Sequence, residues 1–176
     1  MHVELVGRGP IILAGMSYYG PLTGEGWSRE DPIGQLWHRF NLFFDRAPAF
    51  TESRVANPGI GYELGIWNEE EYQKSKCFYV FVGVEVDRLD DMPLELVGKV
   101  LPAGTYAHMT PQGKEISTWE RAFYEEWLPG SGYRVQAHND YQFQIQAYEE
   151  GRFHGLGEKL EESEIDVYVP VEKVAQ

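Results

Sequence analysis

Two short segments bring acidic, amide and aromatic side chains together at the spacing of a β-strand. Side chains alternate between the two faces of a strand, so residues 62–67 place one polar and aromatic set on one face. Residues 143–148 place a second such set on one face of another strand. The six residues are Glu63, Gly65, Trp67, Gln144, Gln146 and Tyr148. Rings supply contact area and a quadrupole and a carboxylate supplies charge, which favours a lipophilic cation as ligand. An ordinary solvated sheet face has the same pattern, and the sequence leaves both interpretations open.

Two tryptophans and a tyrosine extend this set. Trp37 and Trp119 occupy equivalent positions in two predicted helices, where packing into the core is the alternative to facing a ligand. Tyr106 lies on a predicted strand of the second half. The predicted ligand-binding residues are Trp37, Glu63, Trp67, Tyr106, Trp119, Gln146 and Tyr148. No catalytic residue is assigned, although Glu63 is the candidate if the chain is an enzyme.

The elements that must position these residues occur twice in the chain. The segments that begin at Glu4 and Glu95 both read Glu-Leu-Val-Gly, and those that begin at Trp37 and Trp119 both carry arginine two positions later. These similarities keep the same order in both halves, which indicates a duplicated module. The seam between two such modules is a natural place for a ligand cleft.

We expect a single domain, residues 1–176, built from pseudo-repeats 1–90 and 91–176. The predicted strands are 3–7, 11–19, 61–68, 77–87, 94–99, 105–109, 141–149 and 164–171, and helices follow Asp31 and Ser117. The fold class is therefore α+β. Duplicated strand-helix-strand-strand modules form an antiparallel sheet, with two helices packed on one face and a central ligand cleft.

Local signals refine this plan. Ser117, with a glutamate three positions later, predicts a capping box, and Pro129 predicts the end of the helix that follows. Gly83 marks a bulge in a central strand or a close approach to something bound, and Pro170 predicts an edge strand. Residues 150–163 are charged and glycine-rich, so they predict an exposed loop.

The composition argues against several classes of protein. A net charge of −13 argues against nucleic-acid and anionic-membrane binding, and it is compatible with cationic ligands. Cys77 is the only cysteine, so no intrachain disulfide can form, and no apolar run reaches the length of a membrane span. We therefore expect a cytoplasmic protein. The five histidines are scattered, and phosphate-binding and dinucleotide-binding motifs are missing, so we expect no metal and no cofactor.

Three motifs in the second half carry a resemblance to a known family. They are residues 101–106 (Leu-Pro-Ala-Gly-Thr-Tyr), 145–150 (Ile-Gln-Ala-Tyr-Glu-Glu) and 167–171 (Val-Tyr-Val-Pro-Val). With the paired halves, they resemble the GyrI-like small-molecule-binding superfamily. This is the effector-binding domain of AraC- and MerR-type multidrug regulators, which also occurs in stand-alone proteins. The resemblance covers essentially the whole chain and implies a central aromatic cleft for bulky, often cationic, aromatic compounds.

One position departs from the family's pattern. Members commonly carry Phe-Glu-x-Tyr on a second-half strand, where the glutamate meets the positive charge of the ligand. Here the tyrosine is kept as Tyr148, but the acid is replaced by Gln146. We hypothesise that Glu63 supplies the charge from the related strand.

The leading hypothesis is a protein that sequesters or senses bulky aromatic small molecules, without direct nucleic-acid binding and without membrane association. Two alternatives stay open. Some stand-alone members of the superfamily are hydrolases that open strained rings, and here Glu63 would be the general base or water-positioning group. The other alternative is an acidic inhibitor of a protein partner such as gyrase.

Overall fold

A computed structural model describes residues 2–21, 31–155 and 159–174, so most of the glycine-rich stretch 20–26 lies outside the described residues. All strands pair antiparallel in the order β1-β6-β9-β8-β3-β4-β2-β5, with β7 also paired to β9. The strands are β1 (Glu4–Arg8), β2 (Ile11–Gly20), β3 (Ile60–Trp67), β4 (Phe78–Glu85), β5 (Val97–Leu101), β6 (Gly104–Met109), β7 (Tyr133–Val135), β8 (Gln142–Glu149) and β9 (Asp166–Lys173). The α+β class and the antiparallel sheet are confirmed.

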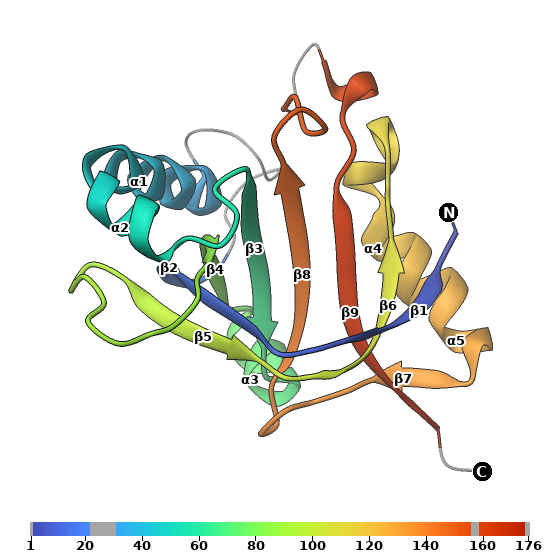
Figure 1. Ribbon diagram of the computed structural model, residues 1–176. Helices are drawn as coiled ribbons and strands as arrows, with labels where there is room; N and C mark the ends of the chain where they lie inside the picture. Colours follow the sequence, from blue (N-terminus) through green and yellow to red (C-terminus); the bar gives the residue numbers. More distant parts are fainter. Residues whose placement is uncertain (1, 22–30, 156–158, 175–176) are drawn as a thin grey trace.

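The sheet curls because β1 and β5 each pair with a strand from the other half of the chain. β1 pairs with β6 and β2 pairs with β5, and the register continues from one pair to the next. Arg8 lies opposite Gly104, and three positions later Ile11 lies opposite Leu101. The ladder is interrupted only at Gly9-Pro10 and the facing Pro102-Ala103, where proline removes a backbone donor. The two bent ribbons run side by side below the central strands (Figure 1).

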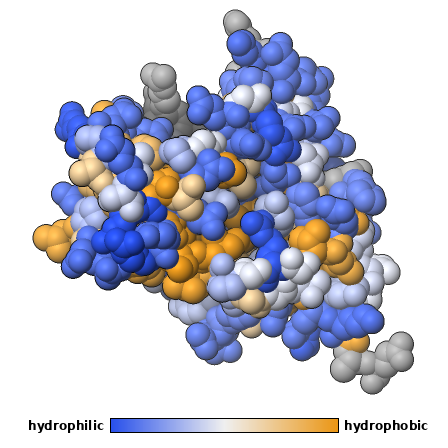
Figure 2. Space-filling view, viewed as in Figure 1, coloured by the Kyte–Doolittle hydropathy of each residue, from blue (hydrophilic) through white to orange (hydrophobic). Residues whose placement is uncertain are grey.

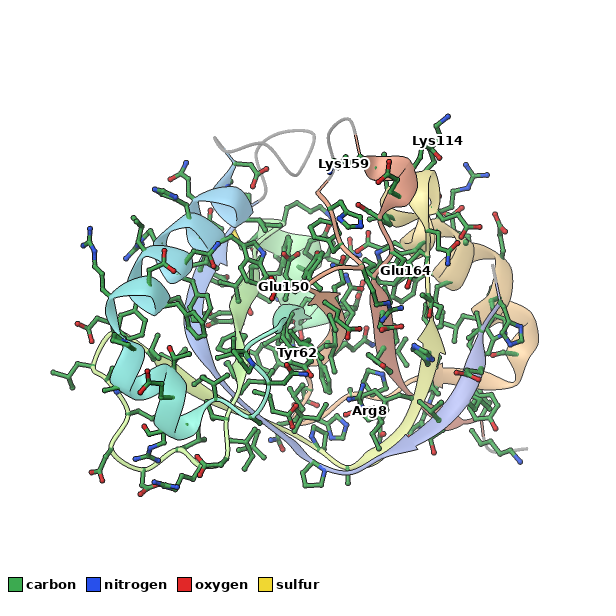
Figure 3. The ribbon with its side chains drawn as sticks, turned by 45° about the horizontal axis from the view of Figure 1, so that its top comes forward. Arg8, Tyr62, Lys114, Glu150, Lys159 and Glu164 are labelled. Carbon is green, nitrogen blue, oxygen red and sulfur yellow. The ribbon has the colours of Figure 1, made fainter. Side chains whose placement is uncertain are left out.

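The inner face of the curled sheet holds one apolar cluster. It contains Leu13, Leu64, Phe81, Phe143 and Ile145, each at most 5 % exposed. At the rim of this cluster, the guanidinium of Arg8 lies 4.0 Å from the centroid of the Tyr168 ring. Arg8 and Tyr62 both lie towards the curve of the sheet in Figure 3. This side of the molecule is thus packed by side chains.

The first half contains one expected helix and two that were not expected. The bounds are α1 (Pro32–Arg46), α2 (Pro48–Arg54) and α3 (Glu69–Ser75). The Asp31 carboxylate caps α1 by accepting a hydrogen bond of 2.8 Å from the backbone N–H of Gly34. α3 begins after Asn68, which accepts from the backbone N–H of Glu71, so the acidic run at 69–71 forms the favourable first turn of a helix.

The helical segment of the second half differs from its expected form. It comprises η1 (Gly113–Ser117), α4 (Trp119–Arg121), the π-helical turn η2 (Ala122–Trp127) and α5 (Leu128–Ser131). The expected capping box is wrong, because Ser117 donates to the carbonyl of Lys114 and the box forms at Gln112 and Glu115 instead. Pro129 does not end the helix. It lies in the first turn of α5, where a missing N–H is tolerated, and Gly132 (φ 76°) ends the helix.

The helices cover the outer face of the sheet in two groups. α1 packs on Val80, Val82 and Val84 of β4, whereas the helical segment of the second half packs on Val167 and Val169 of β9. The two groups flank the central strands β3 and β8 (Figure 1). The prediction of two helices on one face is confirmed, and the central pair lies between them.

Two expectations about glycine and proline have different outcomes. Gly83 faces Gly15 across β2 and β4, and a Cβ on Gly83 would lie 2.3 Å from the carbonyl oxygen of Ala14, so this glycine accommodates the backbone of the neighbouring strand. The edge position expected for Pro170 is wrong, because β9 lies between β6 and β8. The Pro170 carbonyl accepts from Gln136 beyond β7, so its missing N–H falls where the partner of β9 changes from β8 to β7.

Hydrophilic and apolar surface are unevenly distributed. Apolar side chains reach the surface across the middle of one face, whereas its rim is hydrophilic (Figure 2). The exposed apolar side chains include Leu5 on β1 and Val97 and Val100 on β5. These strands are the two ends of the sheet order, so the exposure follows from the topology.

Candidate functional site

The central strands present four facing pairs of residues. Along β3 and β8 these are Gly61 with Tyr148, Glu63 with Gln146, Gly65 with Gln144, and Trp67 with Gln142. The residues that alternate with them along each strand, such as Leu64 and Ile145, point to the other face and belong to the inner cluster. The predicted division into an apolar face and a polar, aromatic face is therefore confirmed. The flanking strands β4 and β9 carry valines on this face. The polar side chains of this face are therefore concentrated on β3 and β8.

A buried network occupies the second pair. Glu63 is 3 % exposed and Gln146 is 6 % exposed. The indole Nε1 of Trp37 donates to Oε2 of Glu63 at 2.7 Å, and the hydroxyl of Tyr148 donates to Oε1 of Gln146 at 3.2 Å. The rings of Trp37 and Tyr148 meet edge-on, with centroids 5.8 Å apart. Four of the seven predicted ligand-binding residues thus lie together.

The surroundings of Glu63 change its acidity. Burial raises the pKa of Glu63 from 4.5 to about 7, because an ion is poorly solvated there. The hydrogen bond from Trp37 lowers this pKa, the charges of Asp31 and Glu120 raise it, and a hydrogen bond from Tyr148 lowers it. The negative charge on Glu63 in turn contributes to raising the pKa of the Tyr148 hydroxyl, after burial itself. Glu63 therefore titrates near neutral pH.

A cavity of about 790 Å³ opens beside this network, and we call it pocket 1. Its aromatic walls are Trp37, Phe40, Phe44, Tyr148 and Phe153, and its carboxylates are Asp45, Glu149 and Glu150. The described lining contains neither lysine nor arginine. Glu150, at the end of β8, is labelled in Figure 3. Rings and acids thus come together in one hollow of drug-like size.

An ion-pair network fixes the far wall of pocket 1. Arg152 donates to Glu149 at 2.9 Å, to Asp166 at 2.6 Å and also to Glu164. These hydrogen bonds raise the pKa of Arg152, which is therefore a permanent cation. They hold the turn after β8 so that Phe153 packs on Tyr148, with ring centroids 4.8 Å apart. This part of the expected exposed loop is an anchored wall.

Trp67 lies in a second hollow. It lines a cavity of about 640 Å³, which we call pocket 2, with Tyr124 of η2 as its aromatic neighbour at 6.5 Å. Trp67 lies six positions after Gly61 along the extended strand β3, which corresponds to roughly 20 Å. The single cleft that was expected to contain Trp67 and Tyr148 is thus two pockets, with the pair Glu63–Gln146 between them.

Four predicted residues lie outside both described linings: Glu63 and Gln146, which form the buried pair between the pockets, and Tyr106 and Trp119, which pack elsewhere. Tyr106 packs in the inner cluster against Phe143, and its hydroxyl donates to the carbonyl of Pro102 at 2.7 Å. Trp119 is 3 % exposed and packs among the residues of the second helical group. Core packing, the alternative considered for Trp119, is what the structure shows. Alternation along β6 points the Tyr106 side chain to the inner face of the sheet, opposite the face that carries Glu63 and Gln146.

Sequence reasoning missed several residues that line the pockets. Phe40 and Phe44 belong to a wide apolar stripe along α1 and were not among the predicted ligand-binding residues. Phe153 follows β8 in a segment expected to be an exposed loop. The sequence signal for these residues is the width of the apolar stripe of α1. A helix with more apolar positions than its contact with the core requires has apolar side chains that can line a pocket.

The described residues contain one free thiol and no cluster of metal-ligating side chains. No group of three or more histidine, cysteine, aspartate or glutamate side chains there is arranged to hold a metal ion. Cys77 is half-buried and its thiol donates to the carbonyl of Ser75 at 3.4 Å. Among the described helices, none combines the length and apolarity needed to cross a membrane.

Comparison with known proteins gives a consistent result. The model of a family described as integron-associated effector binding protein (Cass2) matches residues 4–171. The transcriptional regulator BrlR of Pseudomonas aeruginosa is 30 % identical over 97 % of this chain, and the chain spans 56 % of the length of BrlR. A protein named DNA gyrase inhibitor, from Erwinia billingiae, is 29 % identical over 98 % of this chain and 99 % of its own length.

The fold also matches solved structures. SAV2435, solved with bound tetraphenylphosphonium, superimposes with a TM-score of 0.66 at 15 % identity, over 98 % of this chain and 94 % of that protein. At this identity the likeness concerns the fold alone. The expected relationship to GyrI-like effector-binding proteins is confirmed by the family match.

Proposed function

This chain belongs to the family of integron-associated effector binding proteins, and from that premise we propose that it binds bulky aromatic cations in pocket 1. The family assignment supports a small-molecule ligand. The observation that carries the finer proposal is the composition of pocket 1. Its described lining combines five aromatic rings with three carboxylates and contains no basic side chain.

The physical match to a lipophilic cation has two parts. Aromatic rings attract a cation through their quadrupole and bury its apolar surface. The carboxylates of Asp45 and Glu150 have no ion-pair partner among the described residues, so they are available to a ligand. Glu149, in contrast, is engaged by Arg152. Ionised Glu63 adds a third charge beneath the indole of Trp37.

One protein of similar fold is known to bind such a compound, which supports the proposal. The bound compound in the SAV2435 structure, tetraphenylphosphonium, is a bulky aromatic cation. The chain covers only part of BrlR, so a role as the sensing portion of a regulator is one biological setting for such binding, and sequestration is the other.

Two isosteric ions test the proposal. Tetraphenylphosphonium and tetraphenylborate have nearly the same shape and opposite charge. We expect the cation to bind saturably, as measured by calorimetry, and the anion to bind at least tenfold more weakly. Phe44→Ala should weaken cation binding about tenfold. Phe43→Ala is the matched control, because Phe43 lies on the same helix but packs against Phe50. Equal affinity for both ions, or an equal effect of both variants, would refute the proposal.

Hydrolysis of a bound compound is a second candidate, favoured by the pKa of Glu63. A carboxyl group with a pKa of about 7 is suited to proton transfer at neutral pH. Incubation with a strained-ring electrophile, followed by mass spectrometry, distinguishes the candidates. Product that accumulates with wild-type protein and not with Glu63→Gln supports hydrolysis, whereas an unchanged compound with measurable affinity supports binding alone.

A further inference from the structure

Pocket 2 lies at the other end of the central strand pair. It includes Gly65, Trp67 and Gln144, whereas pocket 1 includes Gly61 and Tyr148. The two linings share no described residue. The buried pair Glu63–Gln146 occupies the interval between them. A compound in one pocket therefore does not fill the other.

The walls of pocket 2 are aromatic and come from four different elements. Trp67 belongs to β3, Tyr72 to α3, Phe78 to β4 and Tyr124 to η2. Tyr124 stands edge-on to Trp67, and Tyr72 stands edge-on to Phe78. At centroid separations of 6.5 and 6.1 Å each pair is in edge-to-face contact, so the two pairs form aromatic walls of pocket 2. The π-helical turn that carries Tyr124 is a feature often found at functional sites.

A polar network is built into one side of pocket 2. Gln144 is 8 % exposed, and its amide group is bonded at both ends. Its Nε2 donates to Oε1 of Glu120 at 2.6 Å, and its Oε1 accepts from the hydroxyl of Tyr124 at 3.1 Å. This arrangement fixes the orientation of the Glu120 carboxylate at the pocket wall. Two acids, Glu69 and Glu120, and one base, Lys76, belong to the described lining, so the local balance is negative.

We propose that pocket 2 is a second binding site, separate from pocket 1, for a flat aromatic cation. The ring of such a cation would lie against the aromatic wall formed by Trp67 and Tyr124, and its charge would face the carboxylate of Glu120. Pocket 2 is smaller than pocket 1 and has fewer carboxylates. A planar cation can lay one face against the aromatic wall of Trp67 and Tyr124. The proposal does not require pocket 1 to be occupied.

Calorimetric titration of the whole chain with ethidium, a planar aromatic cation, tests this proposal. Wild-type protein should bind two molecules per chain. Trp67→Leu and Glu120→Gln should each abolish one binding event or weaken it at least tenfold and leave the other unchanged. Glu120 is exposed and glutamine has the same shape, so Glu120→Gln keeps the test valid if Trp67→Leu destabilises the fold. Phe44→Ala should remove the event that the pocket 2 variants leave intact.

Each other outcome has a definite meaning. A single binding event that Phe44→Ala removes, and that both pocket 2 variants leave unchanged, overturns the second site and keeps the proposed function. A single event that is lost in Trp67→Leu and Glu120→Gln and kept in Phe44→Ala supports pocket 2 and refutes pocket 1. No saturable binding by wild-type protein overturns the second site.

Discussion

The indole Nε1 of Trp37 donates a hydrogen bond to Oε2 of Glu63 over 2.7 Å. This contact joins α1 to the central strand β3 and covers the only glutamate among the four facing pairs described above. Because the same indole ring also lines pocket 1, the protonation of Glu63 and the shape of the pocket are physically connected.

Glu63→Gln should remove a pH dependence of stability. The folded pKa of about 7 exceeds the value of 4.5 for a free glutamate, so between these two pH values the folded chain keeps a proton that the unfolded chain has released. The contribution of Glu63 to stability is therefore present below pH 4.5 and is lost as the pH rises through 7. The loss is about 3 kcal/mol. In denaturant titrations, the variant should gain stability relative to wild type from pH 5 to pH 8. A constant difference would contradict the assigned pKa.

Trp37→Phe should raise the pKa of Glu63 further. Phenylalanine keeps an aromatic ring but has no N–H, so the carboxylate loses a donor that stabilises its ionised form. Infrared or carbon NMR titration of the Glu63 carboxyl measures this directly, with Glu63→Gln identifying the signal. A pKa that stays at about 7 or falls would show that the hydrogen bond does not stabilise the ion.

Gly61→Ala and Gly65→Ala form a matched pair on β3. A Cβ on Gly61 would lie 2.9 Å from the indole of Trp37, whereas a Cβ on Gly65 would lie 3.5 Å from Gln144, an ordinary contact. We expect Gly61→Ala to shift the indole and to weaken tetraphenylphosphonium binding about tenfold. Gly65→Ala should leave the affinity within about twofold. Similar affinities for the two variants would indicate that Trp37 does not shape the site.

Gln146→Glu places the glutamate of the family's usual pattern opposite Glu63. Two like charges directly across antiparallel strands are destabilising. At pH 8 we expect lower stability, by about 1 kcal/mol or more, together with tighter binding of cations. Below pH 5 the stability difference should largely vanish, because both carboxyl groups are protonated. Calorimetry and thermal unfolding at the two pH values measure both effects, and weaker cation binding at pH 8 would oppose the assigned role of charge.

The parts of the site that follow from alternation could be predicted from the sequence. A strand has a period of two, so the shared face of Glu63, Gly65 and Trp67 did not depend on knowing the neighbouring strands. The capped start of α1 was equally local, because Asp31 and Pro32 suffice to specify it.

The site predictions that were wrong depend on contacts between segments far apart in the sequence. The register of β3 with β8 separates Trp67 from Tyr148, and no local pattern reports that register. The face on which Tyr106 lies follows from the exchange of β1 and β5 between the halves, which curls the sheet. Phe153 reaches pocket 1 only because Arg152 is held by three carboxylates, two of them more than ten residues away in the chain.

The central claim is that pocket 1 binds an aromatic cation, and a crystal structure with bound tetraphenylarsonium tests it most directly. Arsenic scatters anomalously, so its position is independent of the fit of the rings. The account predicts an anomalous peak in the hollow between α1 and the end of β8, with phenyl rings against Trp37, Phe44 and Phe153. No peak there in crystals grown with a saturating concentration of the compound would contradict it.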